Sequence, residues 1–222
     1  MPDRTRASVK KALPLVMRRA AHDLTQPVQA LRMILGLPGV VAEDGRELPR
    51  KLDAALIEVE ARLAQMQALA RVLDGAVEAE AARPVRFADV VALARRMRPD
   101  LWTDPLLRVV EALRPVVLPP RAAAWCLNAL LDNARRARPK SRIVVGLRAG
   151  ENRVVVADDG DGMNRATLVA LRRALGGGDA GGLGTGLALA AALVAGWGGE
   201  WLVDARDGGG ACVGFSVADT PG

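Results

Sequence analysis

The sequence is poor in aromatic residues and in cysteine. It contains no tyrosine, two phenylalanines and four tryptophans, although half of its 222 residues are hydrophobic. Its core must therefore be built mainly from aliphatic side chains packed on helices. The two cysteines, Cys126 and Cys212, stand alone, without the spacing of a metal site. We expect both to be small buried hydrophobes in a reducing compartment.

The sequence also lacks a hydrophobic run long enough to cross a bilayer. Its most apolar stretch, residues 187–197, is too short and is flanked by glycines, and the charged N-terminus lacks the apolar core of a signal peptide. The net charge is +6, but the basic side chains are not gathered in one run with aromatics between them. We expect a cytoplasmic, globular protein with no membrane span and no nucleic-acid partner. An anionic ligand or an acidic protein partner stays open.

Two long helices are predicted at residues 8–35 and 47–80, joined by a loop at residues 36–45. Apolar side chains recur in alternating steps of three and four, which indicates a packing seam: Leu13, Met17, Ala21, Leu24, Val28, Leu31 and Leu35, then Leu52, Leu56, Val59, Leu63, Met66, Ala70 and Leu73. An antiparallel hairpin has few neighbours to bury these seams, so we predict that two chains form a four-helix bundle. The alternative is that the seams pack against the C-terminal half of the same chain.

The only histidine of the chain lies on the first of these helices. His22 comes two residues before the seam residue Leu24, which is about 200° of helical rotation, so its imidazole points away from the seam towards water. An exposed imidazole beside the carboxylate of Asp23 is suited to proton exchange or to acting as a nucleophile. Taken by itself, however, the stretch is better explained by an ordinary surface histidine.

Residues 81–84 break the helical pattern, and we place a boundary there between domains at residues 1–80 and 84–219. Beyond it, short β-branched runs alternate with amphipathic segments. Strands are expected at residues 84–87, 107–110, 116–118, 142–147, 153–157, 200–203 and 211–217, and helices at residues 88–97, 121–137, 165–175 and 187–195. This order predicts an α+β protein, in which the hairpin is followed by an α/β sandwich with one mixed sheet and helices on one face.

Two stretches of the second domain carry residues that suit a nucleotide. Asn133 lies on a predicted helix, where its carboxamide oxygen can ligate Mg²⁺, and Arg136 can reach a phosphate from the same side. Asp158 ends a predicted strand, where a carboxylate can accept from an exocyclic amine, and Gly160 and Gly162 let the backbone approach a flat base. Each stretch also fits a plain alternative, namely a polar helix face or a β-turn followed by a helix cap.

A third stretch, residues 181–187 (GGLGTGL), opens a predicted helix. Its candidate phosphate-binding residues are Gly184, Thr185, Gly186 and Leu187, because backbone N–H groups at a helix start bind phosphate. A lone glycine-rich segment can also be only a linker. It is not a Walker loop, because no Gly-Lys-Ser/Thr follows, and no strand runs straight into it as a dinucleotide fingerprint requires.

Taken together and in this order, the stretches resemble the cytoplasmic core of sensor histidine kinases. Asn133 matches the N box of that family, residues 158–162 (DDGDG) match its first glycine box, and residues 184–189 (GTGLAL) match its second. The stretch around His22 matches the phospho-acceptor box, with Pro27 five residues on. The resemblance covers nearly the whole chain, from about residue 8 to residue 217.

The resemblance implies a dimeric histidine-phosphotransfer hairpin followed by an ATP-binding domain of the type shared with gyrase and the heat-shock chaperones. By that analogy, His22 would attack the γ-phosphate of ATP and Asp23 would help to accept its proton. Asp158 would bind the adenine amine, Asn133 the Mg²⁺, and the glycines of the second box the phosphates. The charge of the transferred phosphoryl group would be neutralised by the metal, the helix start and Arg136.

The resemblance also implies partners. The phosphoryl group would pass from His22 to an aspartate on the receiver domain of a response regulator, and a separate sensor protein would supply the input. Gln26, four residues after His22, matches the position where the family often orients water for dephosphorylation of the regulator. A homodimer follows from the four-helix bundle.

Several positions depart from the family pattern. Ala129 stands in place of an asparagine, and the lid, residues 164–183, is short and glycine-rich and lacks the usual phenylalanine motif. Three further alanines replace an aromatic residue, a glycine and a threonine, respectively: Ala137, Ala188 and Ala211. Each departure can lower ATP affinity or rate. We favour the kinase over two alternatives: a histidine phosphotransferase or adaptor that relays phosphate without ATP, and an ATP-dependent conformational switch of the gyrase-like type.

Overall fold

The computed structural model describes residues 80–110, 115–137, 140–148, 153–176, 183–206 and 209–216, together with nine single positions between residues 25 and 59. These nine positions are all helical, in agreement with the two predicted N-terminal helices. Five of them are predicted seam residues: Val28 and Leu56 are 41% and 51% exposed in the single chain, and Leu31, Leu52 and Val59 are half-buried. His22, Asp23 and Gln26 lie outside the described residues.

Five strands form a mixed sheet in the order β2-β4-β5-β7-β6. Their bounds are β2 Leu107–Val109, β4 Ile143–Arg148, β5 Arg153–Asp158, β6 Trp201–Ala205 and β7 Ala211–Ser216. Strand β2 runs parallel to β4, and every other pair of neighbours is antiparallel. A parallel pair needs a long crossover between its strands, and the chain between β2 and β4 supplies one that contains a helix.

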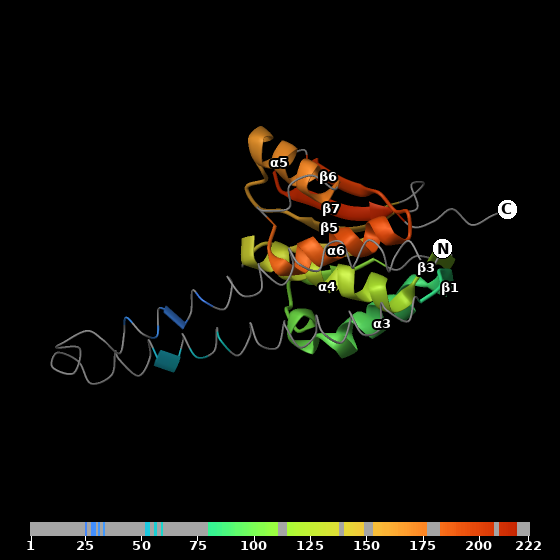
Figure 1. Cartoon of the computed structure of the whole chain (residues 1–222), viewed down its shortest axis with the longest axis horizontal. Helices are drawn as coiled ribbons and strands as arrows, with labels where there is room; N and C mark the ends of the chain where they lie inside the picture. Colours follow the sequence, from blue (N-terminus) through green and yellow to red (C-terminus); the bar gives the residue numbers. More distant parts are fainter. Residues whose placement is uncertain are drawn as a thin grey trace.

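Helices cover one face of this sheet (Figure 1). They are α3 Phe87–Met97, the 3₁₀ helix η1 Pro99–Trp102, α4 Pro120–Ala137, α5 Arg165–Leu175 and α6 Thr185–Gly196. Helix α4 packs between α3 and α6, and α5 packs against the edge strand β6. Helix α6 is apolar on all sides and correspondingly buried. Within the described part of the chain, no helix combines the length and apolarity that a membrane span requires.

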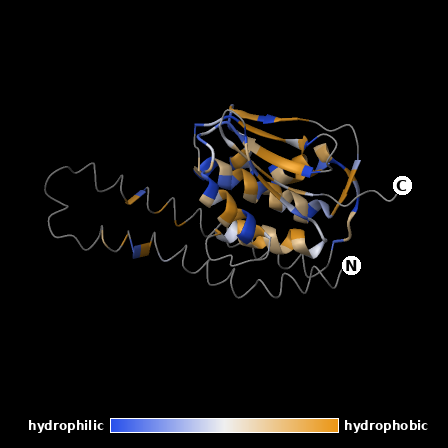
Figure 2. Ribbon diagram, turned by 90° about the horizontal axis from the view of Figure 1, so that it is seen from above, coloured by the Kyte–Doolittle hydropathy of each residue, from blue (hydrophilic) through white to orange (hydrophobic). Residues whose placement is uncertain are grey.

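The core lies between the sheet and the helices. Every second side chain of β5 faces it, so that Val154, Val156 and Asp158 are buried. The strands on either side present Ile143 and Phe215 to the same layer, and neither side chain is exposed to solvent. Figure 2 colours most of the strands as hydrophobic, as a sheet with one covered face requires. Because side chains alternate between the two faces of β5, the carboxylate of Asp158 lies on the same buried face as Val154 and Val156.

A second sheet departs from the single mixed sheet that the sequence predicted. Strand β1, Arg83–Arg86, pairs with β3, Pro115–Leu118, in an antiparallel ladder separate from the larger sheet. Proline has no N–H to donate and is found at strand edges and ends. Pro115 begins β3 and Pro119 follows it, so β3 stays a short strand beside β1. The mixed sheet, its helices and the α+β class are confirmed, whereas the prediction of one sheet for all strands is wrong.

Several boundaries also differ from the prediction by a few residues. Phe87 begins α3 instead of ending β1, and α6 begins at Thr185, two residues before the expected start. The 3₁₀ helix η1 was not predicted. Element ends have weak sequence signals, because capping and packing shift them by one or two residues.

Asn128 connects three elements in the interior. It lies in the middle of α4 and is 5% exposed. Its Oδ1 accepts a hydrogen bond from Nε1 of Trp102 in η1 at 2.8 Å, and its Nδ2 donates to the carbonyl oxygen of Ala94 in α3 at 3.0 Å. The carboxamide of Asn128 therefore forms a hydrogen bond with one polar group on η1 and one on α3.

We predict that Asn128→Leu lowers the free energy of unfolding. The substitution leaves the indole N–H of Trp102 without this partner, and a polar group so stranded costs about 1–3 kcal/mol. The carbonyl of Ala94 loses one hydrogen bond but keeps the one from the N–H of Arg98. Urea denaturation followed by circular dichroism would measure the loss. Asn133→Leu, on the same helix but at a partly exposed position, is the matched control and should unfold near the wild-type midpoint. An unchanged midpoint for Asn128→Leu would contradict the assignment.

Candidate functional site

A cavity of about 600 Å³ opens between the end of β5, the adjoining part of β7, and helices α4, α5 and α6. Its size is that of a site for a small molecule. Its wall is mostly aliphatic with a few polar groups: Leu130, Asn133, Ala134, Ala137, Val156, Asp158, Gly162, Met163, Asn164, Thr167, Ala170, Leu171, Ala174, Leu183, Gly184, Leu187, Ala211 and Val213. Among these residues, Asp158 carries the one charged side chain.

Helix α4 presents a single stripe to the cavity. Leu130, Asn133, Ala134 and Ala137 follow the spacing of three and four that places side chains on one helix face. The leucine and the alanines make this wall apolar, and Asn133 adds a carboxamide. The stripe faces the cavity because the neighbouring face of α4, with Leu127 and Leu131, is used for the core.

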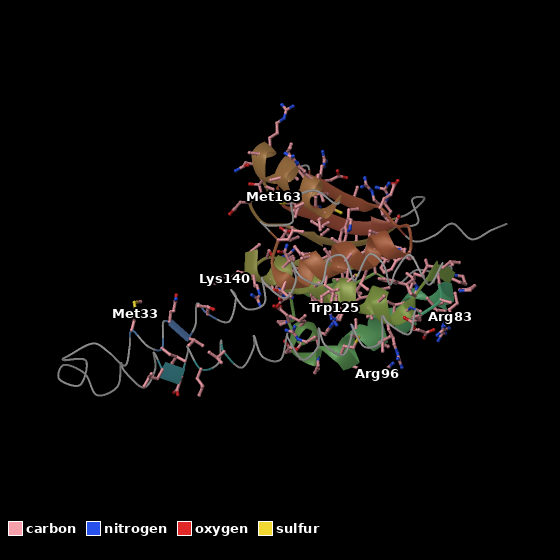
Figure 3. All side chains as sticks on the ribbon, viewed as in Figure 1. Met33, Arg83, Arg96, Trp125, Lys140 and Met163 are labelled. Carbon is pink, nitrogen blue, oxygen red and sulfur yellow. The ribbon has the colours of Figure 1, made fainter. Side chains whose placement is uncertain are left out.

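Helix α5 supplies the opposite wall. Oδ1 of Asn164 accepts a hydrogen bond from the backbone N–H of Thr167 at 2.8 Å, which caps the start of α5. Both residues line the cavity. Met163, labelled in Figure 3, lies where the chain from β5 enters α5 and adds its thioether to the apolar wall. The sequence placed this region in the lid without a predicted binding residue, although an asparagine just before a helical run is an N-cap signal.

The loop after β5 is fixed by its own carboxylates. Oδ1 of Asp158 accepts from the N–H of Gly160 at 3.0 Å. Oδ1 of Asp159 accepts from the N–H of Arg142 at 2.7 Å, and the N–H of Asp159 donates to the carbonyl of Arg142 at 3.2 Å. Asp159 thus ties the loop to the start of β4. Asp158, which is 9% exposed, is one of the residues that line the cavity.

The structure brings five of the nine predicted nucleotide-site residues together on the cavity wall. These five are Asn133, Asp158, Gly162, Gly184 and Leu187. The other four, which are not among its lining residues, are Gly160, Arg136, Thr185 and Gly186. Three stretches that are far apart in sequence thus converge on one hollow.

Arg136 is held by its own helix. Its Nε lies 3.1 Å from Oδ2 of Asp132, one turn earlier on α4. Asp132 is also 3.9 Å from Nη2 of Arg98, whose guanidinium donates to Asp100 with a shortest distance of 2.7 Å. The hydrogen bond with Arg98 lowers the pKa of Asp100, and the same hydrogen bond raises the pKa of Arg98. These ion pairs place the guanidinium of Arg136 beside Asp132 instead of in the cavity wall.

The residues around the cavity are better suited to a metal ion that enters bound to a nucleotide than to a metal ion held permanently by the protein. The described part of the chain contains no cluster of three or more histidine, cysteine, aspartate or glutamate side chains that could hold an ion. Mg²⁺ binds proteins through few side-chain oxygens and keeps water and substrate phosphates as its other ligands. The carboxamide of Asn133 at the cavity wall is suited to that role.

Ala129, where the family has an asparagine, belongs to a helix contact. It packs against the core, and its Cβ is 3.6 Å from the position that a Cβ on Gly186 would take. Two small residues thus meet where α4 approaches the start of α6. The departure at position 129 therefore lies between two helices and outside the lining of the cavity.

Comparisons with known proteins agree with this architecture. Residues 120–221 match the family described as the histidine kinase-, DNA gyrase B- and HSP90-like ATPase. No curated protein sequence matches the chain. This match confirms the resemblance of the second half of the sequence to the ATP-binding part of a histidine kinase catalytic core.

Solved structures share the fold. The histidine kinase AdeS of Acinetobacter baumannii is 18% identical, with a TM-score of 0.56 over 89% of this chain and 97% of that one. Histidine kinase ThkA, solved in complex with the response regulator protein TrrA, is 13% identical, with a TM-score of 0.61 over 96% of this chain and 64% of that one. A bacterial phosphotransferase is 16% identical, with a TM-score of 0.53 over 93% and 96% of the two chains.

We predict that two motif glycines respond differently to alanine. Gly162 has a φ of +79°, and a Cβ there would lie 3.2 Å from the carbonyl oxygen of Gly210, so Gly162→Ala should cost about 1–2 kcal/mol of stability. Gly186 is helical and would meet only Ala129 in ordinary contact, so Gly186→Ala should keep or slightly raise stability. Thermal unfolding of both variants tests this. Equal midpoints would show that Gly162 does not need its left-handed conformation.

Proposed function

We propose that the chain is a two-component histidine kinase, because residues 120–221 match the family of histidine kinase-, DNA gyrase B- and HSP90-like ATPases. It binds ATP in the described cavity, phosphorylates itself on His22 and passes the phosphoryl group to an aspartate on a response-regulator receiver domain. The supporting observation is that Asn133, Asp158 and Gly184, from three separate motifs, line one cavity. If the three motifs resembled those of histidine kinases only by chance, there would be no reason for them to line the same cavity.

The cavity wall suits the parts of ATP. Asp158 offers a carboxylate that accepts from the exocyclic amine of adenine, and the apolar walls suit the flat base. Gly184 precedes the first turn of α6, whose backbone N–H groups and dipole favour phosphate. Asn133 would hold the Mg²⁺ that accompanies the phosphates, and the metal neutralises their charge. Thr185, Gly186 and Leu187 belong to this phosphate-binding start of α6 in the proposal.

The proposed reaction is a phosphoryl transfer from oxygen to nitrogen. An imidazole nitrogen of His22 attacks the γ-phosphorus of ATP, the bond from that phosphorus to the β,γ-bridging oxygen breaks, and ADP leaves. Asp23 accepts the proton that the imidazole loses. Such a transfer depends mainly on alignment and on neutralisation of the phosphate charge. In the reverse direction of signalling, Gln26 would orient water for dephosphorylation of the regulator.

The proposal includes two domains and a homodimer. Residues 1–80 would form the dimerisation and phosphotransfer hairpin, and residues 84–219 the ATP-binding domain. Two predicted seam residues of the hairpin, Val28 and Leu56, are exposed in the single chain, and burial against a second copy would remove them from water. A separate sensor protein would supply the input.

A second candidate function is a phosphotransferase that relays phosphate through His22 without ATP. One observation favours it: the described residues that line the cavity include no arginine or lysine, and Arg136 is paired with Asp132. A site with little positive charge binds a triphosphate weakly unless the metal and the backbone suffice. The same fold would then present His22 to receiver domains.

We predict that γ-labelled ATP with Mg²⁺ labels the purified protein on a nitrogen. The label should be acid-labile, as phosphohistidine is, and His22→Ala should lose it while still binding ATP. Asn133→Ala should bind ATP-Mg²⁺ at least about tenfold more weakly, because it removes the one proposed metal ligand. Filter binding and a fluorescent ATP analogue measure the two effects separately.

The controls separate the candidate functions. Arg108→Ala, which removes an exposed arginine on β2 outside the cavity lining, should be labelled like wild type. Absence of both ATP binding and label would contradict the kinase. Label acquired only from a phosphorylated receiver domain would instead establish the relay. Label that persists in His22→Ala would show that another residue is the acceptor.

A further inference from the structure

The turn between β6 and β7 packs directly behind the loop that holds Asp158. The turn begins at Arg206 and ends at Gly210, and it is closed by hydrogen bonds from the N–H of Arg206 to the carbonyl of Gly210 and from the N–H of Gly209 to the carbonyl of Arg206, both 3.2 Å long. Nη1 of Arg206 donates to the carbonyl oxygen of Asp158 at 2.8 Å. The two segments are almost fifty residues apart in sequence.

Two glycines let this turn approach so closely. Gly209 and Gly210 have φ values of +106° and +87°. A Cβ on Gly209 would lie 2.9 Å from the carbonyl oxygen of Gly160, and a Cβ on Gly210 would overlap the carbonyl of Asp158. Backbone atoms of the turn also border Gly162, since a Cβ there would lie 3.2 Å from the carbonyl oxygen of Gly210. The turn thus packs against the backbone of the loop from Asp158 to Gly162.

Asp158 is consequently held between two anchors. On one side, Arg142 bonds both the side chain and the N–H of Asp159. On the other side, Arg206 bonds the carbonyl of Asp158 itself. A carboxylate that selects a ligand by one hydrogen bond must be held to within a fraction of an ångström. The anchor on the residue that bears the carboxylate controls its position most directly.

We propose that Arg206 is a positioning residue that fixes the carboxylate of Asp158 for recognition of the base. Its guanidinium does not line the cavity, so it acts through the backbone of Asp158 and not by touching the ligand. This inference rests on the proposed function, because it assigns adenine as the base that Asp158 reads. None of the motifs in the sequence includes Arg206.

Comparison of two nucleotides tests the proposal. ITP carries an oxygen where ATP carries the exocyclic amine, so it cannot donate that hydrogen bond to Asp158. Wild type should prefer ATP. In Arg206→Ala, ATP affinity should fall about threefold to tenfold, as expected for one misplaced hydrogen bond, while ITP affinity stays near the wild-type value. Isothermal titration of each nucleotide gives the ratio. Arg206→Lys keeps a donor and should restore part of the preference.

A second measurement does not depend on nucleotide binding. Hydrogen exchange of the peptide covering residues 156–163 should be faster in Arg206→Ala, because the loop loses its anchor, while the thermal unfolding midpoint changes little. Arg148→Ala is the matched control: it removes an exposed arginine that pairs with Asp204 at 3.2 Å on the same sheet, and it should change neither loop exchange nor the preference for ATP.

The outcomes separate this inference from the proposed kinase. Unchanged loop exchange in Arg206→Ala overturns the positioning role, whether or not ATP binds. Faster exchange with an unchanged ratio of ATP to ITP affinity overturns the role in base recognition and leaves the kinase intact. A wild-type protein that binds neither nucleotide contradicts the proposed function, and with it the selection of adenine. Faster exchange together with a lost preference supports the proposal.

Discussion

The carboxylate of Asp158 is the constraint on which the rest of the site depends. It occupies an inward position on a central strand and is 9% exposed, and a buried charge is costly unless hydrogen bonds compensate it. Helices packed tightly against β5 would leave this group without partners. The fold instead supplies the N–H of Gly160 and leaves a cavity of about 600 Å³ under the strand end. The cavity, the hydrogen bond from Gly160 and the contacts of the loop with Arg142 and Arg206 all lie around the side chain or backbone of Asp158 and its neighbour Asp159.

Much of this arrangement followed from periodicity in the sequence. The alternation of β5 predicted a strand that ends at the carboxylate, and the spacing in α4 predicted a helix that carries Asn133, because both patterns are local. The contributions of α5 and Arg206 were not predicted. They arise from contacts between segments that are distant in sequence, and the spacing of hydrophobic residues gives no information about such contacts. The separate pairing of β1 with β3 was missed for the same reason, since a strand pattern gives no information about its partner.

Helix α4 shows how one element serves both the fold and the proposed site. Asn128 and Asn133 are five residues apart, which places them on different faces of the helix. The first binds η1 and α3, and the second lines the cavity. Between them, Ala129 lets α6 approach at Gly186.

The distribution of charge then determines how a triphosphate can be held. Among the described residues, the cavity wall carries one carboxylate and no cationic side chain, and the guanidinium of Arg136 is paired with Asp132. In the proposed kinase, the phosphates must therefore rely on the backbone N–H groups at the start of α6 and on the metal at Asn133. Base recognition through Asp158 supplies the specific contact. A nucleotide would consequently be selected by its base and retained only with its metal ion.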